Sequence, residues 1–298
     1  MKNGIFMTKL PMYLYHFTSS ESVIKILENG KFLPSKIISS NDPFDVDWTS
    51  FSDTYFKNDN EIREFVTQVI THAMRRQSNS LLPKLPDGYS SFTAHQKKVF
   101  SHQIFLCIKN SLSKDGLFHE TRLDGKLSNY RESSYVYCFS STDIGYSMPL
   151  WSHYADNHTG IVLQFALRDS KYNDDVYEVK YKNRKNLRGG ILNYKEARDS
   201  LIQFNDDEFI KYCFQKILLS KSKHWKYENE WRIIDFDAKS HPYIEVNDSL
   251  ITAIYLGLNI TETDKAKISK LVSDKYSGMK IFIAEKDTRY IKFNFMPI

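Results

Sequence analysis

Hydrophobic and polar residues follow one pattern before about residue 134 and another pattern after it. Near the start, residues 13–17 (YLYHF) read as a strand, and Thr18 with Glu21 forms a T-x-x-E capping box. Gly30 is placed to end the short helix that this box begins. We therefore expect a strand, a tight turn and a helix at the beginning of the chain.

Apolar residues then recur at helical spacing in residues 58–76 and 95–112, which predicts a helical insertion over residues 57–130. After residue 134, runs rich in β-branched and aromatic residues predict strands. These runs are YVYCFS, GIVLQF, VYEVKY, EWRIIDF, TAIYLGL, KIFIAE and YIKFNF, with helices expected around residues 207–221 and from TETD onward. The sequence predicts an α+β fold with a mainly antiparallel sheet, in a single domain spanning residues 1–298.

Composition narrows the class of protein. Hydrophobic residues make up 41% of the 298 residues and aromatic residues 14%, which favours a compact fold with aromatic-walled clefts. No stretch approaches the roughly 18 uncharged apolar residues of a membrane helix, and no secretory signal is recognisable. We expect a soluble cytoplasmic protein without a membrane partner. Cys107, Cys138 and Cys213 are odd in number and far apart, so a disulfide framework or a Cys-x-x-Cys metal site is not expected.

Positive charge is concentrated in one region. Residues 180–232 contain 13 Lys and Arg against 7 Asp and Glu, whereas the whole chain has a net charge of only +5. Such a region attracts the phosphates of a dinucleotide or a nucleic acid. The alternative interpretation is a solvated, lysine-rich helical face.

The segment EWRIIDF contains the first candidate chemistry. A two-residue period places Glu230 and Arg232 on one strand face, and Glu228 joins them if the extended segment begins slightly earlier. Successive residues on one face lie about 6.7 Å apart, so two carboxylates there would flank one site and raise each other's proton affinity. This arrangement suits a positively charged transition state. The alternative is an edge strand that carries solvated charges.

His16 lies in an aromatic strand directly before a helix N-terminus, where free backbone amides favour an anionic ligand. The alternative for His16 is a hydrogen-bonded core residue. Further along, Trp151 and Tyr154 are candidates to stack on nicotinamide or adenine, with core packing as their alternative. His153 and His158 are five residues apart and do not align on a helix face, so no metal site is expected.

The ordered motifs LYHFT, SNDPFD, CFS, LWSHYADNHTGIVLQF, WKYENEWR and IYLGL resemble the bacterial family called domain of unknown function 2971. More distantly, a His in the first strand, a central aromatic residue and a late Glu are similar to the ADP-ribosyltransferase fold, including toxins that modify DNA or RNA. That resemblance implies that His16 contacts the adenosine-side ribose, Tyr154 packs near nicotinamide, and Glu230 bonds the nicotinamide ribose.

The string Glu228-Asn229-Glu230 is also similar to the E-x-E motif of transferases that modify arginine, in which the first Glu orients the acceptor. The sequence departs from those relatives in two places. His16 stands where they carry Arg, and Ser140 and Ser141 match their Ser-Thr-Ser segment only loosely.

The resemblance implies an NAD-dependent ADP-ribosyltransferase or NAD glycohydrolase, acting as a bacterial toxin or phage-defence effector on a macromolecular acceptor, with nucleic acid among the candidates. NAD is then the substrate, and no metal is required. The expected catalytic residues are Glu230, Glu228 and Tyr154, and the expected cofactor-binding residues are His16, Thr18, Asn41, Ser140, Trp151 and Arg232. Two alternatives stay open: a nucleic-acid-binding or nuclease-type defence protein that uses the basic region, and a non-catalytic interaction module.

Overall fold

The computed structural model describes residues 9–37, 42, 58–75, 85–113, 130–182, 206–236 and 242–298. Contacts divide the chain into two units, which we describe separately. The first unit comprises Met1–Lys36, Ser134–Val179 and His224–Ile298, and the second comprises Ile37–Ser133 and Lys180–Lys223. Asn41 and the part of the basic region in residues 183–205 lie outside the described residues.

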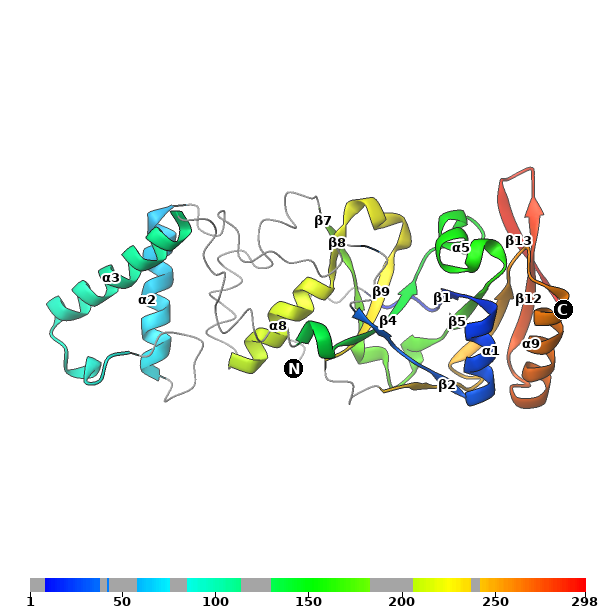
Figure 1. Ribbon diagram of the computed structural model, residues 1–298, viewed down its shortest axis with the longest axis horizontal. Coiled ribbons are helices and arrows are strands. Elements are labelled where there is room, and N and C mark those ends of the chain that lie inside the picture. The colour runs from blue at the N-terminus through cyan, green and yellow to red at the C-terminus, as the bar shows by residue number, and fades with distance from the viewer. Residues whose placement is uncertain are drawn as a thin grey trace. The chain divides into compact units, whose positions relative to one another are not determined.

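A nine-stranded sheet forms the centre of the first unit (Figure 1). Its strands follow the order β13-β12-β11-β5-β1-β4-β9-β6, with β3 beside β4. Their bounds are β1 Leu14–Thr18, β3 Ser35–Lys36, β4 Tyr135–Ser140, β5 Ile161–Phe165, β6 Val176–Glu178, β9 Glu230–Asp235, β11 Ile251–Leu256, β12 Lys280–Asp287 and β13 Lys292–Pro297. Within this sheet, β11 and β12 are parallel and the other described pairs are antiparallel. The α+β class with a mainly antiparallel sheet is confirmed.

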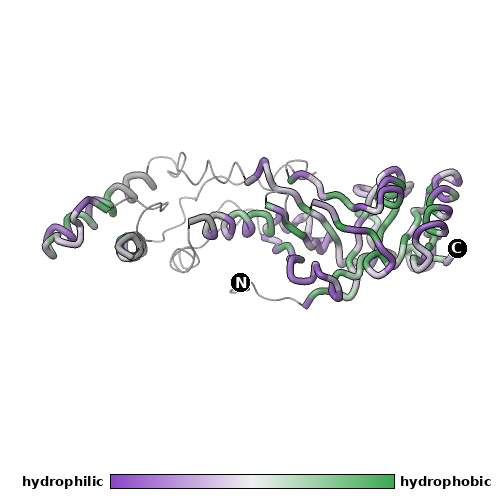
Figure 2. Tube along the Cα trace, turned by 90° about the horizontal axis from the view of Figure 1, so that it is seen from below, coloured by the Kyte–Doolittle hydropathy of each residue, from purple (hydrophilic) through white to green (hydrophobic). Residues whose placement is uncertain are grey.

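Helices cover both faces of this sheet. Helices α1 (Ser20–Asn29) and α9 (Glu262–Lys275) lie side by side on one face, where their apolar residues join the main core. On the opposite face, α5 (Met148–Tyr154) inserts Trp151 against Phe17. In Figure 2 hydrophobic stretches recur through the part of the chain that ends at the C-terminus, and β5, in the middle of the sheet, is buried along its whole length.

The first helix begins one residue later than the capping box predicts. Thr18 still pairs with Ile161 as the last residue of β1, so it cannot act as the helix cap. Ser19 is the N-cap instead, and its hydroxyl accepts a hydrogen bond from the Ser22 amide at 3.2 Å. Gly30 ends the helix as expected, in a left-handed conformation with φ 64°.

The second unit contains the expected helices, α2 (Asp59–Arg75) and α3 (Ala94–Ser113), which pack against each other, and α8 (Asp206–Leu218). It also contains β7 (Lys180–Lys182), which pairs in parallel with β8 (Ser220–Ser222). The single strand expected for VYEVKY is therefore wrong: β6 pairs with β9, and the chain leaves that ladder at Val179.

The remaining short elements connect these strands and helices. They are β2 Lys31–Phe32, which pairs with β10 Ile244–Glu245, and the 3-10 helices η2 Tyr89–Ser91, η3 Asp156–His158, η4 Leu167–Asp169, η5 Asn173–Asp175 and η6 Lys223–Glu228. Across the described part of the chain, no helix combines the length and the apolar character needed to cross a bilayer.

Candidate functional site

The two candidate carboxylates lie on either side of a change in backbone conformation. Strand β9 begins at Glu230, whereas Glu228 is the last residue of η6. Between them, Asn229 has a positive φ of 41°. The extension of the strand back to Glu228 is therefore wrong. The turn nevertheless keeps both glutamates buried at the start of β9, at 4% and 6% exposure.

Glu230 is held by Arg232, its neighbour on the same strand face. Arg232 donates from Nε to Oε1 at 2.7 Å and from Nη2 to Oε2 at 3.0 Å, which is the bidentate geometry of a guanidinium with a carboxylate. Arg232 is 1% exposed. Both contacts of the Arg232 guanidinium are directed at Glu230, and the expected contact of Arg232 with the cofactor stays a prediction.

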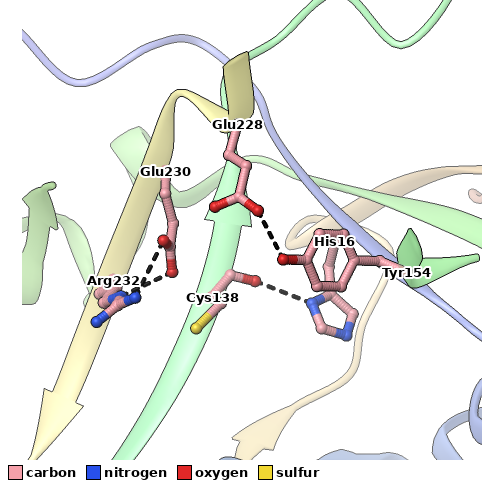
Figure 3. A network of polar contacts seen from close by, with 6 residues as sticks. All are labelled: His16, Cys138, Tyr154, Glu228, Glu230 and Arg232. Atoms are coloured by element: carbon pink, nitrogen blue, oxygen red, sulfur yellow. Dashed lines mark hydrogen bonds and ion pairs between the residues drawn. The ribbon is translucent and has the colours of Figure 1, made fainter. Parts of the chain in front are cut away.

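Glu228 is held from the opposite side by Tyr154, at the end of α5 (Figure 3). The Tyr154 hydroxyl donates to Glu228 Oε1 at 2.6 Å. Burial raises the pKa of Tyr154, and the adjacent Glu228 carboxylate raises it further. The hydroxyl therefore stays protonated at neutral pH and acts as a fixed donor to the carboxylate.

Ser140, the last residue of β4, ties this turn to the sheet. Its hydroxyl donates to the backbone carbonyl of Glu228 at 2.5 Å, and the Thr142 hydroxyl donates to the same carbonyl at 3.2 Å. Next to them, the Ser141 amide donates to the Asn229 carbonyl at 3.1 Å. These contacts fix the backbone that carries the carboxylates. Ser140 was expected to contact the cofactor, but its hydroxyl is committed to this internal contact.

His16 bridges a gap in the sheet. Strand β1 pairs with β4 at Tyr15 and Ser140 alone, and His16 Nδ1 lies 2.9 Å from the carbonyl oxygen of Cys138 (Figure 3). A carbonyl oxygen accepts only, so Nδ1 carries a proton and donates it. Burial lowers the pKa of His16, which keeps the ring neutral at pH 7 and leaves Nε2 as an acceptor. No described residue donates to Nε2.

The register of three strands places His16 and Glu230 on opposite faces of the sheet. Tyr15, Ser140 and Glu230 are partners across β1, β4 and β9, so their side chains share the face that α5 covers. His16 is next to Tyr15, and its ring contacts Phe139 on the α1 side, with centroids 6.3 Å apart. The structure thus gathers Glu228, Glu230 and Tyr154 but does not place His16 on their face.

Two other expected contact residues, Trp151 and Thr18, differ in how the fold uses their side chains. Trp151 is fully buried, and its indole nitrogen donates to the Ile144 carbonyl at 2.8 Å. It is a core residue, so the structure does not place it in the wall of a ligand cleft. Thr18 ends β1 opposite Ile161, and its hydroxyl has no hydrogen bond to the described residues.

A strained turn after α5 was not found by sequence reasoning. Asp156, Asn157 and His158 all have positive φ, at 47°, 51° and 70°. A Cβ on Gly257 would lie 2.3 Å from the His158 carbonyl oxygen, so only glycine allows this close approach. Within the described ranges, no group of three or more His, Cys, Asp or Glu side chains is placed to hold a metal ion.

Comparison with protein families gives a match over a segment that begins within α5 and includes β5 and both glutamates. Residues 150–233 match the model described as "Protein of unknown function (DUF2971)". Over these residues, the match confirms the expected resemblance to that family. The DUF2971 segment contains Tyr154, Glu228, Glu230 and Arg232, whereas His16 lies outside it. No curated protein and no solved structure matches the chain.

Proposed function

We propose that this protein cleaves the nicotinamide glycosidic bond of NAD and passes ADP-ribose to a macromolecular acceptor or to water. The observation that carries the proposal is the pair of buried carboxylates at the start of β9, Glu228 held by Tyr154 and Glu230 held by Arg232. Buried, hydrogen-bonded carboxylates are costly unless their charge is used or balanced, and such groups concentrate at functional sites.

The chemistry needs a fixed negative charge beside the ribose. When the carbon–nitrogen bond breaks, its electron pair leaves with nicotinamide, and the ribose gains oxocarbenium character. A preorganised carboxylate in a site that excludes water stabilises that positive charge. The acceptor nucleophile, or water, then forms the new bond to the ribose carbon and loses its proton.

We assign the ribose contact to Glu230 and the orientation of the acceptor to Glu228. Arg232 balances the charge of the Glu230 carboxylate and holds it in one rotamer, so that the negative charge beside the reacting ribose is fixed in place. Tyr154 fixes Glu228 in the same way. Both carboxylates are thus positioned before substrate arrives, as electrostatic catalysis requires.

His16 takes a narrower role than the resemblance implies. Its Nε2 is an acceptor that suits a hydroxyl donor, such as that of a ribose. His16 lies on the α1 side of the sheet, on the face opposite Glu230, so NAD cleavage at the carboxylates does not require a contact with His16.

The experiment is direct. The purified full chain is incubated with NAD, and released nicotinamide is measured by chromatography, alone and with lysate protein, DNA or RNA as acceptor. Nicotinamide release with label transfer to one acceptor class supports the proposal. An absence of release under every condition, with the protein shown to be folded, contradicts it.

A further inference from the structure

A cavity of about 380 Å³ lies in the first unit, where the turn of residues 143–146 forms part of its lining. We call it the aromatic cavity. The lining residues that matter for ligand binding are Tyr15, Asp143, Tyr255, Phe282, Lys292 and Phe295. Its volume falls within the range of about 300 to 1,000 Å³ that is usual for small-molecule sites.

The walls of the aromatic cavity are rings. Tyr255 and Phe282 are register partners on β11 and β12, and their rings stack with centroids 5.1 Å apart and planes at 14°. Phe295 from β13 meets Tyr255 edge-on at 5.0 Å. The Tyr255 hydroxyl is already committed to Gln164 Oε1 at 2.6 Å, which fixes the ring. These surfaces suit a flat, unsaturated ring rather than an aliphatic chain.

Two polar groups at the aromatic cavity, the Asp143 carboxylate and the Tyr15 hydroxyl, can form further hydrogen bonds. Asp143 is exposed; its Oδ1 accepts the Gly145 amide at 2.9 Å, and no described residue donates to Oδ2. The half-buried Tyr15 hydroxyl also has no hydrogen bond to the described residues. Burial raises the pKa of Tyr15, and Asp143 contributes to that rise, so the hydroxyl stays a donor. An acceptor and a donor therefore lie side by side.

Lys292 supplies a positive charge at the same cavity. It lies over the rings of Tyr146 and Tyr290, 5.8 and 5.7 Å from their centroids, and it forms no ion pair within 4 Å in the described part of the chain. Asp287 pairs with Lys292 across β12 and β13, and the Lys292 charge helps to lower the pKa of Asp287. The Asp287 carboxylate accepts hydrogen bonds from Asn294 and from two backbone amides. The ammonium group is available to an anionic ligand.

We propose that the aromatic cavity binds a nucleoside monophosphate unit. The base packs against the aromatic wall formed by Tyr255 and Phe282, its exocyclic amino group donates to Asp143, a ring nitrogen accepts from Tyr15, and the phosphate binds Lys292. An aromatic amino acid fits less well, because its ring edge offers no neighbouring donor and acceptor, and its two charges are on one carbon. This binding site does not depend on NAD cleavage.

The test uses the full chain and AMP as the probe, with adenosine as the uncharged comparison, in calorimetric titrations. AMP binds and adenosine binds about tenfold more weakly, the effect of losing one charged hydrogen bond. Lys292→Met lowers AMP affinity to that of adenosine and leaves adenosine affinity unchanged, which a purely structural role would not do. Asp143→Asn, which retains the contact with Gly145, weakens both ligands about tenfold.

Lys270→Met is the matched control, because it removes the same charge from an exposed position on α9, which covers the other face of the sheet. It keeps wild-type AMP affinity. Circular dichroism and melting temperature establish that each variant is folded. The proposal is overturned if AMP gives no heat at millimolar concentration, if phenylalanine binds in place of AMP, or if Lys292→Met and Asp143→Asn bind AMP like the wild type.

The nucleotide unit has two sources, a free nucleotide or the adenosine half of NAD, and a competition assay distinguishes them. If it belongs to NAD, AMP inhibits nicotinamide release competitively, and Lys292→Met raises KM without lowering kcat. If it is a free nucleotide, AMP does not compete with NAD. This assay rests on the proposed function, whereas the AMP titrations do not, so the two proposals fail separately.

Discussion

Arg232 and Glu230, two residues apart on β9, form a bidentate ion pair of which both side chains are almost completely buried, at 2% and 7% exposure. Desolvation of two charges costs free energy that their mutual attraction offsets only while both partners are present. The pair therefore links the stability of the sheet to the proposed catalytic group. Any substitution of Glu230 acts on both.

Glu230→Gln is expected to destabilise the fold by about 3 kcal/mol, because it removes the carboxylate charge that two nitrogens of the buried Arg232 guanidinium contact. Urea unfolding followed by tryptophan fluorescence measures this loss. The double variant Glu230→Leu with Arg232→Met removes both charges and is expected to recover much of it. Glu21→Gln is the control: it breaks the exposed Lys25–Glu21 pair, which solvent screens, and is expected to change stability far less. Equal effects from Glu230→Gln and Glu21→Gln would contradict the account.

The cap of the first helix gives a second prediction. Ser19→Ala removes the hydroxyl that accepts the Ser22 amide and is expected to cost about 1 kcal/mol in the free energy of unfolding. Thr18→Ala is the matched control, with an expected cost below about 0.5 kcal/mol because this hydroxyl caps nothing. A larger loss of unfolding free energy in Thr18→Ala than in Ser19→Ala would show that Thr18 is the cap.

Gly257→Ala tests the close approach behind the strained turn. The new Cβ would lie 2.3 Å from the His158 carbonyl oxygen, and backbone atoms cannot move aside easily. We expect a loss of about 2 to 3 kcal/mol. Gly88→Ala, at φ 74° with nothing within 4 Å, carries only the backbone cost of about 1 kcal/mol. Similar losses at both positions, measured by urea unfolding, would show that the approach is not tight.

The pH dependence of stability follows from His16. Its pKa in the folded protein lies below the ordinary value of 6.5, so the unfolded chain binds more protons and stability rises with pH up to about 6.5. Below that pH, this contribution is lost as the pH falls toward the lowered pKa. His16→Gln keeps a donor for the Cys138 carbonyl but does not titrate. The wild type should therefore lose stability relative to His16→Gln between pH 7.5 and 5, and a constant difference would refute this.

The sequence predicts elements better than it predicts their relative positions. The alternation in EWRIIDF correctly places Glu230 and Arg232 together, because side-chain period depends on local backbone alone. The register between β1 and β4 sets which face His16 occupies, and that pairing joins residues far apart in the chain. The same limit hides the aromatic cavity, since Asp143, Tyr255 and Lys292 come from a turn and two distant strands.

Local ambiguity explains the smaller differences. Thr18, Ser19 and Ser20 are all acceptable caps, and the pairing of Thr18 with Ile161 decides among them. The left-handed Asn229 ends the extended conformation before Glu228 is reached, although an Asn between two Glu residues does not by itself indicate a turn.

Nicotinamide release by the wild type, Glu230→Gln and Glu228→Gln, at saturating NAD and at a temperature where all three are folded, tests the central claim most directly. Glu230→Gln keeps the shape of the side chain but loses the charge, so release should fall about a hundredfold to a thousandfold while NAD binding survives. Glu228→Gln should reduce transfer to the acceptor while slow NAD hydrolysis persists. Loss of release in Glu228→Gln alone would exchange the two roles, and full activity in both variants would contradict the proposed enzyme.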